Sequence, residues 1–174
     1  MTKPFSRMLA ASLCTLSALL PAGCESIDLN DDRIPRTRVY VPFTSAGEWD
    51  FFGVGGALQS RVFIREEGVP SDYPYPDYSY TGYGGVLLTC DVNSEPQAFD
   101  LSCPVERLRD VRISIDREEN LARCSKCGST YDVFAIRGEG PGAPVSGPAR
   151  TDGYALRAYR VLFNVDGRYA LISN

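Results

Sequence analysis

The chain has 174 residues and a net charge of -4 at pH 7, with 18 Lys and Arg against 22 Asp and Glu. This length accommodates one ordinary domain with a hydrophobic core, and the acidic balance argues against a nucleic-acid partner, which requires clustered basic residues. The sequence contains no histidine. Ser-His-Asp and Cys-His catalysis are therefore excluded, as is every histidine-ligated metal site.

The N-terminus predicts a lipoprotein signal peptide over residues 1–23. Lys3 and Arg7 supply positive charge, and an apolar run over residues 8–20 is too short to anchor the chain across a bilayer. The run ends at Pro21-Ala22-Gly23-Cys24, which resembles a bacterial lipobox with Pro21 in the place of the usual Leu. We expect acylation of Cys24 and attachment to the outer membrane through the lipid. The alternative is ordinary cleavage near Ala22.

Residues 24–36 are acidic and polar, and they predict a flexible linker between the lipid and a single domain over residues 37–174. Within the domain the pattern indicates short strands and no sustained helical period, so the predicted fold class is all-β. Ser45 and Glu48 fit a capping box for one brief helix, and Asp166-Gly167 fits a hairpin turn. The expected strands cover 37–43, 60–65, 86–90, 97–102, 111–116, 121–123, 131–136, 154–161 and 168–173.

Two segments predict loops. Residues 138–147 are rich in Gly and Pro, and residues 68–85 combine Pro70, Pro74 and Pro76 with five tyrosines. Prolines at this density exclude a central strand or a helix. The tyrosines of residues 70–83 either present an aromatic surface to a glycan or protein partner, or cover the domain with their rings. We favour the second, because tyrosine covers apolar surface while its hydroxyl stays wet.

The most informative motif is Cys124-Ser-Lys-Cys127-Gly128, in which two thiols lie on one tight turn. Such a turn is a metal-ligand arrangement. Cys103 and Cys90 precede it, and with Cys14 and Cys24 set aside in the signal peptide and at the lipid, these four cysteines remain in an exported protein. An even number of this kind is also compatible with disulfides.

The order of features over residues 98–161 resembles the Rieske iron–sulfur domain. Cys103 and Cys124 stand at the family's two cysteine ligands, and the match continues through Gly128-Ser129 with Tyr131-Asp132, then Gly147-Pro148-Ala149 and Leu156. The resemblance implies stacked antiparallel sheets with a small cluster-binding subdomain around residues 103–134. Both histidine ligands of the family are replaced, by Val105 and Cys127.

Three interpretations of the cysteines remain open. The resemblance implies a 2Fe-2S cluster held by Cys103, Cys124 and Cys127, with Cys90, Glu106 or another group as fourth ligand. Zinc is the second, bound by Cys90, Cys103, Cys124 and Cys127. The third is a scaffold without metal, in which the resemblance implies a Cys103–Cys124 disulfide, because these two sulfurs meet at one iron in the family.

The corresponding functions are electron transfer with an unidentified redox partner, or a non-redox surface lipoprotein that binds a partner through the tyrosine-rich loop. Catalysis has little support, since Glu106 and Asp132, the carboxylates considered as an acid pair near the Cys124–Cys127 turn, are isolated in loops. We therefore expect an electron-transfer or binding module and no enzyme.

Overall fold

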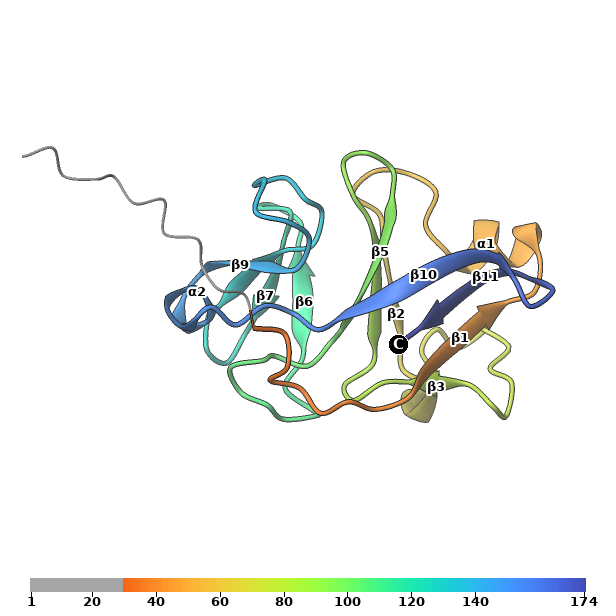
Figure 1. The fold of residues 1–174 in the computed structure, drawn as a ribbon, viewed down its shortest axis with the longest axis horizontal. Helices are drawn as coiled ribbons and strands as arrows, with labels where there is room; N and C mark the ends of the chain where they lie inside the picture. Colours follow the sequence, from red (N-terminus) through yellow and green to blue (C-terminus); the bar gives the residue numbers. More distant parts are fainter. Residues whose placement is uncertain (1–29) are drawn as a thin grey trace, which may run out of the picture.

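The computed structural model describes residues 30–174. This part of the chain is built from two sheets in which every neighbouring pair of strands is antiparallel (Figure 1). The predicted all-β class is confirmed. Helical structure is limited to α1 (Ala46–Phe52), α2 (Pro148–Asp152) and the single turn η1 (Arg65–Glu67). Within residues 30–174, no helix has the length and apolar character needed to cross a membrane.

The larger sheet has seven strands in the order β2-β4-β5-β10-β11-β1-β3. The predicted closing hairpin is present, with the left-handed φ values of Asp166 and Gly167, 50° and 72°, at its turn. In chain order the strands are β1 (Val39–Phe43), β2 (Ser60–Phe63), β3 (Tyr80–Thr81), β4 (Val86–Cys90), β5 (Pro96–Asp100), β10 (Ala158–Val165) and β11 (Arg168–Ser173).

The smaller sheet has four strands in the order β6-β7-β8-β9 and is formed by one continuous stretch of chain inserted between β5 and β10 (Figure 1). This insertion overlaps the small subdomain expected around residues 103–134 and extends beyond it to β9. Its strands are β6 (Ile113–Asp116), β7 (Leu121–Cys124), β8 (Thr130–Asp132) and β9 (Ala143–Ser146).

Strand β4 separates two hydrophobic cores. All five of its residues are buried, and because side chains alternate across a strand, they divide between two faces. Val86, Leu88 and Cys90 belong to the core of the larger sheet, whereas Leu87 joins the core beneath the smaller sheet. The second core includes Cys103 and Cys124. The cysteine site therefore rests on the apolar packing that joins the two sheets.

The expected loop over residues 138–147 was wrong in its second half, where β9 pairs with β8. Pro144 is tolerated because β9 is the edge strand of its sheet, and a register shift lies beside it. Helix α2, with Pro148 at its first turn, was also missed, and β10 begins four residues later than expected, at Ala158. By contrast, half of the predicted capping box is present, since Ser45 accepts a hydrogen bond from the Glu48 N–H, while the Glu48 carboxylate accepts from the N–H of Thr44 and not of Ser45.

The tyrosine-rich loop covers the domain with part of its rings, as favoured from the sequence. Tyr73 is only 4% exposed, and its ring meets those of Phe43, Phe52 and Phe63 edge-on or tilted, which places it in the core. Tyr78 is half exposed. The loop therefore covers the domain with its first rings and leaves its later ones in solvent.

The predicted linker lies partly outside the described residues, and its described part packs against the domain. Ile34 is 1% exposed, and its carbonyl oxygen accepts hydrogen bonds from the guanidinium of Arg157. Asn30 exchanges backbone hydrogen bonds with Gly153 and Ala155. The ordered domain thus begins before residue 37. The signal peptide and Cys24 lie outside the described residues.

Candidate metal centre

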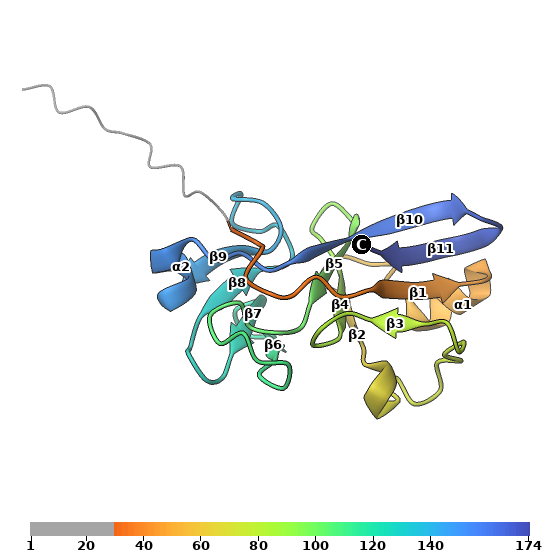
Figure 2. The same ribbon diagram turned by 60° about the horizontal axis from the view of Figure 1, so that its bottom comes forward.

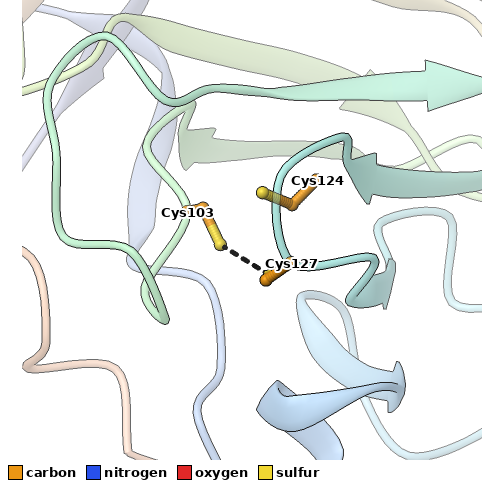
Figure 3. Close-up of side chains that lie close together, drawn as sticks. All are labelled: Cys103, Cys124 and Cys127. Carbon is orange, nitrogen blue, oxygen red and sulfur yellow. Dashed lines mark hydrogen bonds between the residues drawn. The ribbon is translucent and has the colours of Figure 1, made fainter.

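Two loops bring three of the four predicted cysteines together. Cys103 lies between β5 and β6, Cys124 is the last residue of β7, and Cys127 lies on the turn from β7 to β8. Figure 3 shows the three side chains pointing toward one another from facing loops. The first loop, which contains Cys103, connects β5 of the larger sheet to β6 of the smaller one. The second loop, which contains Cys124 and Cys127, is the hairpin turn between β7 and β8 of the smaller sheet.

The second loop is closed by its own backbone. The Gly128 N–H donates to the Cys124 carbonyl at 3.0 Å, and the Cys124 N–H donates to the Ser129 carbonyl at 2.9 Å. Gly128 has a φ of 74°, a left-handed conformation that residues with a side chain resist. These bonds point the thiols of Cys124 and Cys127 to the same side of the turn.

The first loop is held in a similar way. The Cys103 N–H donates to the Val111 carbonyl, and the Arg107 N–H donates to the Cys103 carbonyl, both at 2.9 Å. The Cys103 thiol itself is completely buried. Its position is therefore fixed by backbone hydrogen bonds on both sides and by the packing of the second core.

The three sulfur atoms form a compact group. Sγ of Cys103 lies 3.6 Å from Sγ of Cys127, and all three sulfurs lie within 4.8 Å of one another (Figure 3). Cys103 and Cys124 are buried, while Cys127 is partly exposed. Four-coordinate zinc with Zn–S bonds of 2.3 Å separates its sulfur ligands by about 3.8 Å. The distance between Cys103 and Cys127 matches this value, and the 4.8 Å limit brings Cys124 close enough to share one ion with them.

Two hydroxyl groups lie against these sulfurs. The Tyr131 hydroxyl is 3.6 Å from Sγ of Cys103, and Ser129 Oγ is 3.2 Å from Sγ of Cys127. Ser129 Oγ also accepts a hydrogen bond from the Ala149 N–H at 3.1 Å. Because a hydroxyl has one proton, this acceptance leaves the Ser129 proton available to a thiolate at Cys127.

The surroundings of Cys103 and Cys127 shift the pKa values of their thiols in opposite directions. Burial raises the pKa of the Cys103 thiol to about 12. Burial also raises the pKa of Cys127, but hydrogen bonds from the hydroxyl and N–H of Ser129, together with those from the thiols of Cys103 and Cys124, outweigh it, so this pKa lies below its ordinary value. Cys127 is therefore the more readily ionised of the two, and a cation is needed to stabilise a thiolate at Cys103.

The Gly147-Pro148-Ala149 segment packs behind the second loop. Gly147 has a φ of 74°, and a Cβ at this position would lie 2.9 Å from the Cα of Ser129. Only glycine allows the chain to pass this close. The close approach is what lets the Ala149 N–H reach Ser129 Oγ and orient its hydroxyl.

The structure does not bring Cys90 to the group. Cys90 faces the core of the larger sheet, on the opposite side of β4 from Leu87 and the cysteine site. Strand alternation explains this, since residues 86, 88 and 90 share a face. Among residues 30–174, no fourth His, Cys, Asp or Glu joins the three sulfurs.

The two carboxylates considered from the sequence are also accounted for. Glu106 is paired with Lys126 across the two loops, Oε2 to Nζ at 2.6 Å. Asp132 is completely buried and accepts hydrogen bonds from the N–H groups of Phe134, Ile136 and Arg137. Asp132 ends β8 and holds the loop after it in place, so the expectation of an isolated loop carboxylate was wrong for this residue.

Comparison of the chain with protein-family models, with curated proteins and with solved structures finds no match.

Proposed function

We propose that this protein binds a single thiophilic metal ion, of which zinc is the model case, through Cys103, Cys124 and Cys127. The observation that carries the proposal is the mutual distance of the three sulfurs, all within 4.8 Å. A set of three protein ligands leaves one coordination position for water or another small ligand. Partial exposure of Cys127 supplies access to that position.

The contribution of the chain to this centre is preorganisation. The loop backbones hold the sulfurs together before binding, while the hydroxyls of Ser129 and Tyr131 supply donors for thiolates at Cys127 and Cys103. Binding requires deprotonation of the thiols, so protons are released when the ion enters. The ion, when bound, supplies the positive charge that the buried Cys103 thiolate otherwise lacks.

A 2Fe-2S electron-transfer centre, as the Rieske resemblance implies, is the second candidate. It is favoured by the supply of one cysteine from the first loop and of a Cys-x-x-Cys pair from the second. A cluster of this kind needs four ligands. The described residues offer three in the group, and the side chain of Val105 cannot serve as a fourth. The donor set thus fits one ion and leaves a cluster incomplete.

A centre without metal is the third candidate. The resemblance implied a Cys103–Cys124 disulfide, whereas the structure holds Cys90, Cys103, Cys124 and Cys127 as free thiols. The 3.6 Å separation makes Cys103 and Cys127 a pair that can also oxidise. Either disulfide would remove two ligands at once, so oxidation and metal binding exclude each other.

We further propose that the chain is exported and acylated at Cys24, which would place the domain at the outer membrane. This proposal rests on the sequence of residues 1–24. A redox or surface partner is then expected outside the cytoplasm, and nucleic acid is not. The domain acts as a binding or electron-transfer module.

Metal analysis and a visible spectrum of the full chain, purified without oxygen, test the centre. We expect one zinc or cobalt ion per chain, with thiolate-to-metal absorption in the cobalt form. Cys103→Ser, Cys124→Ser and Cys127→Ser should each weaken binding strongly, while Cys90→Ala is the matched control and should keep one ion.

The other candidates give different results in the same preparation. A coloured product with two irons and two sulfides after anaerobic reconstitution would favour the cluster. Failure to bind zinc, cobalt or iron, together with an intramolecular disulfide found by mass spectrometry, would favour the metal-free centre and overturn the proposal.

A further inference from the structure

A second site lies where the segment that precedes β1 meets the chain just before β10 (Figure 2), since Arg157 donates to the Ile34 carbonyl there. A cavity of about 340 Å³ opens there. This volume is within the range of small-molecule sites. Half of its lining residues are arginines and none is acidic: Arg36, Arg157, Ala158, Tyr159, Arg160 and Asn174.

We call Arg36, Arg157 and Arg160 the arginine site. Hydrogen bonds to the main chain hold the side chain of Arg157 in place. Its side chain is 9% exposed, and its Nε and Nη2 atoms donate to the Ile34 carbonyl at 3.1 and 2.7 Å. Within residues 30–174, its Nη1 atom has no hydrogen-bond acceptor. A buried guanidinium that is held on one edge and free on the other is preorganised to bind an anion.

Arg36 and Arg160 bring two further guanidiniums to the rim. Arg36 donates from Nε and Nη2 to Oδ1 of Asp32, and Arg160 donates from Nη2 to the main-chain oxygen of Asn174 at 3.1 Å. In the described part of the chain, Nη1 of both residues is likewise without an acceptor. Each arginine of the site therefore keeps one NH2 group for a ligand.

Positive charge exceeds negative charge at this site. Oδ1 of Asp32 is shared, at 2.8 Å from Arg36 and 3.2 Å from Arg157, and Asp31 attracts Arg36 more weakly. Three guanidiniums thus face two carboxylates, and Arg160 contacts neither. In a chain with a net charge of -4, three arginines around one cavity run against the overall composition.

We propose that Arg36, Arg157 and Arg160 form a binding site for a phosphate group, carried either by a soluble phosphate compound or by a phospholipid headgroup. Guanidinium groups match the oxygen edges of phosphate and donate to them in pairs. A tetrahedral, multiply charged anion can accept hydrogen bonds from several guanidinium groups at once, and three line this cavity. The site is independent of the cysteine centre.

Titration of the full chain with inorganic phosphate and with glycerol phosphate, followed by calorimetry, tests the soluble source. Flotation with phosphatidylglycerol vesicles, against phosphatidylcholine vesicles as reference, tests the lipid source. Arg36→Gln and Arg160→Gln change exposed side chains, so the fold should survive. Arg61→Gln is the matched control, since Arg61 is an exposed arginine of β2 that donates only to its neighbour Ser60.

Each variant at the site should weaken phosphate binding about tenfold, the value of one charge-assisted hydrogen bond, and Arg61→Gln should leave it unchanged. Arg157→Lys, which keeps the charge and loses the paired geometry, should weaken it as well. Arginine-dependent binding to phosphatidylglycerol vesicles alone would identify the lipid as the source. Absence of binding in both assays, or binding that Arg36→Gln and Arg160→Gln leave intact, would overturn the proposal.

Discussion

Lys126 and Glu106 join the two cysteine loops, with Nζ of the lysine 2.6 Å from Oε2 of the glutamate. Lys126 lies between Cys124 and Cys127, and Glu106 follows Cys103 by three residues. The hydrogen bond and charge of Glu106 raise the pKa of Lys126. This ion pair is the one side-chain salt bridge among the described residues that links the loops of the metal centre.

Breaking this ion pair should let the loops separate more often and release the ion faster. We expect Lys126→Met to increase the dissociation rate of zinc about two- to fivefold, the scale of a partly exposed ion pair. Transfer of zinc to a chromogenic chelator measures the rate. Arg36→Met, which breaks the exposed pair with Asp32 in the segment before β1, is the control. An equal change in both variants would contradict a role for the pair at the metal centre.

Ser129→Ala should make Cys127 harder to ionise. Hydrogen bonds from Ser129 lower the pKa of Cys127 against the effect of burial, so removal of the hydroxyl should raise that pKa. In metal-free protein, alkylation of Cys127 at pH 7 should become severalfold slower, because the thiolate is the reactive form. Ser125→Ala, on the exposed side of the same turn, should alkylate at the original rate. Mass spectrometry of the modified peptide follows the reaction.

The lipid anchor is tested separately from the domain. Cells that express the chain and are fed a fatty-acid analogue should label it, and the Cys24→Ala chain should carry no label. The reason is that Cys24 follows the small residues Ala22 and Gly23 at the end of the apolar run. Retention of the label in the Cys24→Ala chain would refute acylation at this residue.

The strands and the cysteine group could be predicted because local patterns determine them. The alternation of residues 111–116 and the Asp166-Gly167 turn lie within short windows of sequence, and both occur in the structure. Cys124 and Cys127 share one turn, so their proximity needed no long-range information. The place of Cys103 opposite them came from the family resemblance and not from spacing.

The wrong predictions have a common cause: the role of each residue depends on which residues surround it in the folded chain. Four of the five residues of β4 are apolar and all five are buried, so the sequence does not show which face of β4 turns to the cysteines, and Cys90 was included as a ligand. Strand β9 was concealed by Pro144, which only an edge position tolerates. The arginine site joins Arg36, assigned to a linker, with Arg157 and Arg160 far along the chain, and no local signal connects them.

The junction of the two sheets supplies a prediction on pH. Asp100 is completely buried and accepts hydrogen bonds from the N–H groups of Tyr83, Gly84 and Ser102, and from the Tyr159 hydroxyl at 2.6 Å. Burial, together with the Asp100 carboxylate, raises the pKa of Tyr159 far above its ordinary value of 10.0. The folded protein therefore resists ionisation of Tyr159, whereas the unfolded chain does not.

A group with a raised pKa in the folded state contributes stability below its unfolded pKa, and that contribution is lost as the pH rises above it. The free energy of unfolding should therefore fall above about pH 10, and this fall should be smaller in Tyr159→Phe. At pH 7 the same variant should be less stable by about 1–3 kcal/mol, the value of a hydrogen bond to a charged group. Urea unfolding at pH 7 and pH 11 measures both effects. Tyr78→Phe, at a half-exposed ring, is the control and should match the stability of the wild type at both pH values. If Tyr159→Phe loses as much stability between pH 7 and pH 11 as the wild type does, Tyr159 does not couple folding to pH.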